Sequence, residues 1–110
     1  MNFKVQILIE GKWMTFTWET LNETILFGND LSTYKKRFWT GIKDRNGKEI
    51  YEGDIIGRRG MKNTFVEYEG CRWVLRYDEP KIEWRQDLHN QTSLHLEVIG
   101  NIYENSDLLP

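Results

Sequence analysis

The chain has 110 residues, of which 29% are charged, and its formal net charge is -2 at pH 7. Because neither sign dominates, this composition excludes a protein that attracts or imitates nucleic acid through its overall electric field. The single cysteine, Cys71, excludes an internal disulfide framework and suits a reducing compartment. No apolar run has the length of a signal-peptide core or a membrane span, so we expect one soluble intracellular domain, residues 1–110, with no membrane partner.

Residues 3–18 are predicted to form a β-hairpin, because apolar and polar side chains alternate in both halves. The apolar positions are Phe3, Val5, Ile7 and Ile9 in the first half and Met14, Phe16 and Trp18 in the second. A two-residue Gly11–Lys12 loop would pair Ile9 with Met14, Ile7 with Phe16 and Val5 with Trp18. This register places the apolar side chains on one face of the hairpin.

The segment 19–37 gives the weakest pattern of the chain. Thr20 and Glu23 have the spacing of a capping box before an apolar stretch, and Gly28 would end that helix. Asp30 would begin a second short turn. These signals favour short helical turns, while residues 24–27 would also suit a strand.

The stretch 38–57 contains two turn signals separated by short apolar strands. Asp44–Gly47 is the first turn and Glu52–Asp54 the second, because Asn, Asp and Gly tolerate turn conformations at little steric cost. Ile50–Tyr51 and Ile55–Ile56 are the predicted strands. We expect this stretch to belong to a β-rich core that covers residues 38–110.

A second hairpin is predicted between Thr64 and Tyr77, with its turn at Gly70. A two-residue loop there places Val66, Tyr68, Trp73 and Leu75 together on one face, and Glu67 and Glu69 near Arg72 on the other. Further strands are expected at 82–84 and 94–103. Short strands separated by frequent turns predict an all-β fold with short helical turns, either a small barrel or a strongly bent antiparallel sheet.

Residue types suited to catalysis or metal binding are few, and each has a simpler structural explanation. Asp87, His89 and His95 lack the paired short spacing of a structural zinc site, and Cys71 lies beside a turn without a sign of an electropositive pocket. Glu49, Glu52 and Asp54 are close in sequence, but Asp54 is better explained as a turn residue that binds its own backbone. The sequence therefore predicts no enzyme, no cofactor and no metal.

Two features favour a binding function. Five Trp, five Tyr and five Phe must dominate either the core or an interface, because the interior of a small barrel has limited room. Trp13 and Trp84 are the rings we expect outside if some do not fit, and there they would mark a protein interface. Cations also lie next to aromatic residues in 35–39, and Arg58, Arg59 and Lys62 form a basic loop between glycines. Such pairs of charge and ring suit single-stranded nucleic acid, although a solvated face is the simpler explanation.

Two segments resemble the YopX family of small phage and prophage proteins. They are WTGIKDRNGKEIYEGDII at 39–56 and LEVIGNIYEN at 96–105, whereas residues 1–37 differ from the strand with which the family usually opens. The resemblance implies a compact β-rich domain, a phage or integrated-element origin and the bacterial cytoplasm, and it implies no reaction. The motif residues are interpreted as structural: Gly41, Asp44, Gly47, Tyr51, Gly53, Asp54 and Gly100.

The leading hypothesis is a non-enzymatic phage accessory protein that binds another protein, either a host or phage factor or a second copy of itself. That step rests on analogy with small phage inhibitors and adaptors rather than on a site. Nucleic-acid binding by a small β-barrel through Arg58, Arg59 and Lys62 is the alternative.

Overall fold

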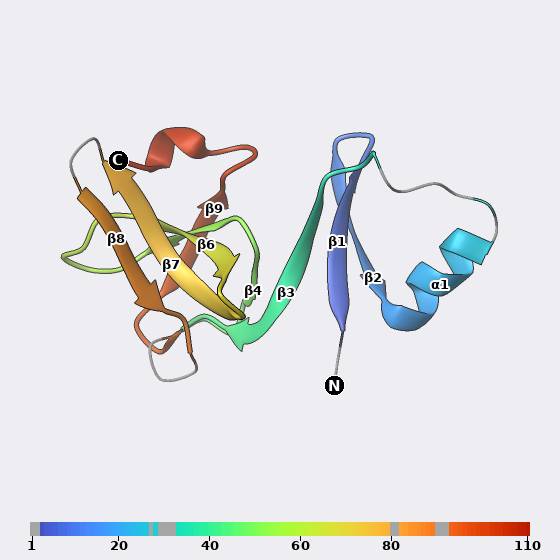
Figure 1. The fold of residues 1–110 in the computed structure, drawn as a ribbon, viewed down its shortest axis with the longest axis horizontal. Coiled ribbons are helices and arrows are strands. Elements are labelled where there is room, and N and C mark those ends of the chain that lie inside the picture. The colour runs from blue at the N-terminus through green and yellow to red at the C-terminus, as the bar shows by residue number, and fades with distance from the viewer. Residues whose placement is uncertain (1–2, 27, 29–32, 80–81, 90–92) are drawn as a thin grey trace. The chain divides into compact units, whose positions relative to one another are not determined.

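A computed structural model of the chain describes residues 3–26, 28, 33–79, 82–89 and 93–110. The fold is drawn in Figure 1. Its elements are β1 (Lys4–Ile9), β2 (Lys12–Thr17), α1 (Trp18–Leu26), β3 (Lys36–Lys43), β4 (Glu49–Tyr51), β5 (Asp54–Gly57), β6 (Thr64–Glu69), β7 (Arg72–Glu79), β8 (Ile82–Asp87), β9 (Glu97–Asn101) and the short 3-10 helix η1 (Ser106–Leu108). Of these, α1 alone is an α-helix, and it is too short to cross a membrane, as is every helix in the described residues.

The strands form two sheets, with the orders β2-β1-β3-β4 and β8-β7-β6-β5-β9. The recorded strand pairs are antiparallel. The all-β prediction is therefore confirmed. Within the described residues both sheets are open and have edge strands, so the bent-sheet alternative holds and the closed barrel does not.

The chain divides into two compact units, Met1–Trp39 and Thr40–Pro110. We call them unit 1 and unit 2. Strand β3 runs across the boundary between the two units. The sequence predicted a division of the chain between residues 37 and 38, and the observed boundary lies two residues later.

The hairpin of unit 1 forms as predicted, but its register is different. Its turn is Glu10–Gly11, whose φ angles of 50° and 79° are both positive, as a type I′ turn requires. The pairs are consequently Ile9 with Lys12, Ile7 with Met14 and Val5 with Phe16. Because the shift from the predicted register is two residues, the apolar side chains still share one face.

Helix α1 confirms the predicted helical turn and excludes a strand at residues 24–26, but its cap is not the predicted one. The main-chain N–H of Thr17 donates to Thr20 Oγ1 at 2.8 Å, and the N–H of Thr20 donates to Thr17 Oγ1 at 3.4 Å. This reciprocal pair is a capping box on Thr17 rather than on Thr20 and Glu23, and it draws Trp18 into the first turn of the helix. The turn predicted at Asp30 lies outside the described residues.

The second hairpin has the predicted register. Val66 pairs with Leu75, Tyr68 with Trp73 and Glu69 with Arg72 across the Gly70–Cys71 turn. Val66 and Leu75 are buried, and Trp73 packs against the core of unit 2, but Tyr68 is 53% exposed. Tyr68 is near the end of its strand and meets Trp73 edge to face at 5.0 Å, so it lies on the predicted face without being buried there.

The two units have separate apolar cores. In unit 2 the buried cluster consists of Ile50, Ile56, Val66, Leu75, Leu88 and Leu96, with Ile42, Trp73, Trp84 and Val98 packed against it. In unit 1 the buried cluster consists of Val5 and Ile7, with Phe3, Ile9, Phe16 and Leu21 around them. Among the described residues, the buried core of unit 1 is thus much smaller than that of unit 2.

Candidate interaction surfaces

The first turn of the family motif is tied to strand β9 by one buried carboxylate. Asp44 Oδ1 accepts hydrogen bonds from the main-chain N–H groups of Asn46 at 2.8 Å and Lys48 at 2.9 Å. Its Oδ2 accepts from the N–H of Val98 at 3.0 Å. The Arg45 N–H adds a bond to the Leu96 carbonyl. Asp44 therefore closes its own turn and holds two segments that are 54 residues apart.

This environment lowers the pKa of Asp44 below its ordinary value of 3.8. Burial, the largest single influence, raises the pKa, because it disfavours the charged form. The hydrogen bonds from Val98, Lys48 and Asn46, with the charge of Lys48, act in the opposite direction and together outweigh burial. Asp44 is thus held ionised as a structural acceptor, which is not the state of a general acid.

The other motif residues also have structural roles, either in a turn or at a position where glycine is required. Asp54 is buried and its Oδ2 accepts from the N–H of Tyr51 at 2.8 Å, within the second turn. Gly47 has φ 79°, a conformation that side chains with a Cβ rarely adopt. A Cβ on Gly53 would lie 3.1 Å from the Tyr103 ring, and one on Gly100 would lie 2.6 Å from Asn105 Oδ1. Gly41, like Gly47, has a positive φ angle.

The structure does not assemble the candidate catalytic residues into a site. Cys71 is exposed at the hairpin turn, and His89 and His95 are exposed near the C-terminal part of unit 2. Asp87 pairs instead with Arg72 at 3.2 Å. Among the residues that the structure describes, no group of three or more His, Cys, Asp or Glu could hold a metal ion.

Unit 1 exposes large apolar side chains around its small core. They are Met14 (48% exposed), Trp18 (58%), Ile25 (53%) and Phe38 (42%), and we call them the unit 1 apolar surface. Phe3 joins two of them, since its ring centroid lies 5.5 Å from that of Trp18 and 6.1 Å from that of Phe38.

Helix and sheet both contribute to this surface. Trp18, Leu21 and Ile25 have the spacing of one helix face, and Leu21 packs on the buried Val5 and Ile7. Met14 and Phe38 lie on the strands beside β1, opposite Ile7 and Val5 respectively. The exposed apolar groups therefore surround the same buried pair.

The opposite face of this sheet carries cations on aromatic rings. The Arg37 guanidinium lies 4.6 Å from the Trp13 ring centroid and its Nε donates to Gln6 Oε1, while Lys4 Nζ lies 4.7 Å from the Trp39 ring centroid. Trp13 is half-buried beneath these contacts. The Trp13 ring is therefore less exposed than we expected for a ring outside the core. Its role in a protein interface stays a prediction.

In unit 2 the basic loop lies over a stacked ring pair. Tyr77 and Trp84 face each other across β7 and β8, with centroids 5.6 Å apart and an interplanar angle of 12°. Arg58 lies 6.0 Å from the Trp84 ring and donates to Gln86 Oε1 at 3.0 Å, and Lys62 Nζ lies 5.5 Å from the Tyr77 ring. Arg59 is exposed. Trp84 was predicted to lie outside the core, but it packs against the core of unit 2 and is therefore partly included in it.

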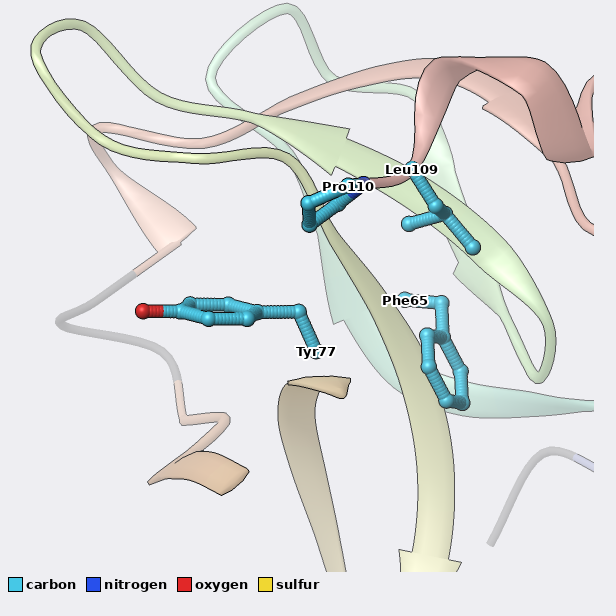
Figure 2. Close-up of a pocket in the computed structure, with 4 residues that line it drawn as sticks. All are labelled: Phe65, Tyr77, Leu109 and Pro110. Atoms are coloured by element: carbon cyan, nitrogen blue, oxygen red, sulfur yellow. The ribbon is translucent and has the colours of Figure 1, made fainter. Parts of the chain in front are cut away.

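A pocket of about 170 Å³ lies beside the Tyr77 ring and is also lined by Phe65, Leu109 and Pro110. In Figure 2 the rings of Tyr77 and Phe65 extend away from each other, and Leu109 and Pro110 lie next to them. Sites for small organic ligands usually have roughly 300–1,000 Å³, so this pocket is too small for a nucleotide or a cofactor.

Oppositely charged side chains on β6, β7 and β8 pair with one another in the part of these strands whose side chains are described. Arg76 Nη1 lies 2.6 Å from Glu67 Oε2, and Arg85 contacts both Glu69 at 3.0 Å and Glu83 at 3.1 Å. A phosphate backbone on this face would meet these carboxylates, which disfavours nucleic acid there.

The comparisons with known proteins identify the family. The sequence model described as YopX protein matches residues 12–110. The chain belongs to the YopX family. The match begins within β2, so the YopX domain includes most of the N-terminal third, which had been interpreted as departing from the family's opening.

The fold of this YopX domain also occurs in a solved structure. The crystal structure of protein EF1440 from Enterococcus faecalis is similar, with a TM-score of 0.54 and 24% sequence identity, covering 98% of this chain and 75% of that one. At this identity the similarity shows the fold alone. No functionally curated protein has a sequence that matches the chain.

Sequence reasoning missed the exposure of Trp18 and Phe38, and with it the unit 1 apolar surface. Trp18 had been assigned to the inner face of the hairpin because it continues the alternation of Met14 and Phe16. The capping box at Thr17 and Thr20 was the available signal, since a helix that begins at residue 18 ends that alternation.

Proposed function

We propose that this YopX protein acts by binding another protein through the unit 1 apolar surface. The observation that supports the proposal is the exposure of Met14, Trp18, Ile25 and Phe38 around Val5 and Ile7, the buried core residues that the structure describes in unit 1. Large exposed apolar groups that lie together are typical of protein interfaces, whereas single ones are common on any surface.

The size of unit 1 gives a physical reason for a partner. A unit of about 40 residues usually cannot bury enough apolar area to be stable without additional contacts. Covering Trp18 and Phe38 would remove two aromatic rings from water, and buried aromatic rings are frequent energetic centres of interfaces. A partner that covers this surface would thus extend the core of unit 1.

The proposal includes the biological setting that the family resemblance implies. We place the protein in the bacterial cytoplasm as a non-enzymatic accessory protein of a phage or prophage, acting on a host or phage protein. This part rests on analogy with other small phage proteins and not on a contact in the structure.

The test is a double variant, Trp18→Glu with Phe38→Glu. Wild-type protein cross-linked in a lysate of the bacterium that carries the gene would identify candidate partners by mass spectrometry, and each candidate would then be purified. We expect the double variant to bind the purified partner at least about 30-fold more weakly in titration calorimetry, because the loss of two interface aromatics typically costs 2 kcal/mol or more.

The matched control is Leu94→Glu, which places the same charge on an apolar residue of unit 2 that is 68% exposed. Circular dichroism would establish that all variants stay folded. The proposal is wrong if the double variant retains wild-type affinity, or if Leu94→Glu weakens binding equally.

One observation favours nucleic acid as the alternative function. Arg58 and Lys62 lie against a stacked Tyr77–Trp84 pair, and basic and aromatic groups together suit a single strand. However, Arg58 already lies over the Trp84 ring and Lys62 over the Tyr77 ring. A base could therefore stack on either ring only by displacing one of these cations. Protein binding is therefore the better-supported function.

The alternative predicts a specific salt dependence. Arg58→Ala with Arg59→Ala should weaken binding to a dT oligonucleotide and reduce the slope of log Kd against log salt by about 1.4, or about 0.7 for each lost phosphate contact. Lys43→Ala with Lys48→Ala, which removes two exposed cations elsewhere in unit 2, is the control. Absence of oligonucleotide binding at low salt, or equal effects of both pairs, would exclude this surface.

A further inference from the structure

Three of the four edge strands in the described sheets have their outer side protected. Strand β4 has only three residues, and its Tyr51 N–H is used by Asp54. Among the β8 side chains that the structure describes, residues 83–87, the exposed ones are all charged: Glu83, Arg85 and Asp87. On β9, the N–H of Val98 donates to Asp44. Short strands, edge charges and covered backbone are the usual means by which proteins prevent strand addition.

Strand β2 lacks these protections. It has six residues, KWMTFT, without proline, and its single charged residue is Lys12 beside the turn. Lys12, Met14, Thr15 and Thr17 are exposed. A strand with this composition has a high tendency to pair.

The turn geometry fixes which backbone groups of β2 point outward. In a two-residue hairpin the residues that flank the turn, here Ile9 and Lys12, form a hydrogen-bonded pair, and such pairs alternate along the strands. Met14 and Phe16 thus bond to β1, while the N–H and C=O groups of Trp13, Thr15 and Thr17 point away from it. Thr20 Oγ1 accepts a hydrogen bond from the Thr17 N–H and donates one to the Thr17 C=O. Both groups of Thr17 therefore bond to a residue outside β1, as this alternation requires.

We propose that β2 is a docking edge for an extended segment of a partner protein, which adds to the sheet as an antiparallel strand centred on Thr15. This inference rests on the proposed function and specifies how the partner binds. The main-chain N–H and C=O of Thr15 bond to the partner residue directly opposite, because only an extended backbone presents a donor and an acceptor at that spacing.

The side chains of β2 define the chemistry of the partner strand. Residues opposite Met14 and Phe16 are apolar, because they extend the face that carries the apolar core of unit 1. The residue opposite Thr15 is polar or β-branched. The residue opposite Lys12 is acidic, because Lys12 is the one charge on the strand.

The probe is a fluorescein-labelled peptide, acetyl-Thr-Val-Thr-Val-Thr-Glu-amide, whose third residue lies opposite Thr15 and whose Glu lies opposite Lys12. Its binding to the full chain is measured by fluorescence anisotropy. N-methylation of the third residue, whose N–H faces Thr15, should weaken binding by about tenfold or more. N-methylation of the fourth residue, whose N–H faces away, should leave binding unchanged.

Two protein variants test the same bond from the other side. Thr15→Pro removes an N–H that β1 does not use, and edge strands tolerate proline in that position, so the fold should persist while peptide binding is lost. Thr15→Val removes the hydroxyl and its bond to Gln6 but keeps the N–H, so it should bind as the wild type does.

A charge exchange tests the register. Replacing the peptide Glu by Lys should weaken binding by about two- to fivefold, as expected for an exposed ion pair, and Lys12→Glu should restore it. The inference is overturned if the peptide does not bind, or if methylation at the third and fourth residues has equal effects. If the peptide fails while Trp18→Glu with Phe38→Glu still disrupts a captured complex, strand addition is wrong and the proposed function remains.

Discussion

Replacement of Asp44 by alanine is expected to lower the free energy of unfolding by about 3 to 4 kcal/mol, because three main-chain N–H groups lose a charged acceptor at once. These groups belong to Asn46, Lys48 and Val98. Urea denaturation at pH 7 measures the change. Asp44→Asn should have an intermediate effect, since its one carbonyl oxygen can replace only part of the carboxylate.

The Asp44 contribution should also depend on pH. Its pKa is lower in the folded protein than its ordinary value of 3.8, so ionisation favours the folded state. The stabilisation is fully present above pH 3.8 and is lost as the pH falls through the folded pKa. The difference in stability between wild type and Asp44→Ala should therefore shrink below about pH 4. A difference that stays constant from pH 7 to pH 3 would contradict this role, and Asp107→Ala, at an exposed carboxylate, is the control.

Local patterns predicted most of the strands but missed β3 (Lys36–Lys43), whose first residues lie in the segment predicted to form helical turns. Turn chemistry decided where the prediction of pairing succeeded. At Gly70–Cys71 the glycine opens the loop, and the predicted register of Val66 with Leu75 is observed. At the first hairpin Glu10 adopts a positive φ, so the loop begins one residue before the glycine. A positive φ at glutamate is uncommon, and the alternation of apolar residues cannot detect it because a two-residue shift keeps the same face.

The interaction surfaces were less predictable, because they combine residues that are distant in sequence. The sequence identified Arg58 and Lys62 as a basic loop, but their positions over Trp84 and Tyr77 depend on how β5, β6, β7 and β8 assemble. Leu109 and Pro110 reach the pocket beside Tyr77 from the end of the described chain. The edge position of β2 likewise follows from the sheet order and not from the residues of β2 itself.

Gly100→Ala is expected to destabilise the protein by about 2 to 3 kcal/mol, since overpacking a tightly packed site forces neighbouring groups to move. A Cβ at this position would lie 2.6 Å from Asn105 Oδ1 and 2.9 Å from Asn105 Cβ. Asn105 cannot easily move away, because its N–H donates to the Asn101 carbonyl and its Oδ1 accepts from the Asn101 N–H. The change should appear as a lower denaturation midpoint in urea.

The matched control for Gly100→Ala is Gly57→Ala, where the added Cβ would meet Ile99 Cγ2 at 3.3 Å, a contact that the 40% exposed Ile99 side chain can relieve by a small shift toward solvent. We expect this control to change stability by less than about 1 kcal/mol. Asn105→Gly removes the clashing Cβ and amide, so combining it with Gly100→Ala should cost less than the sum of the two single variants, because residues in contact are not additive. Additive effects, or equal losses in Gly57→Ala and Gly100→Ala, would show that the contact with Asn105 is not what requires glycine at position 100.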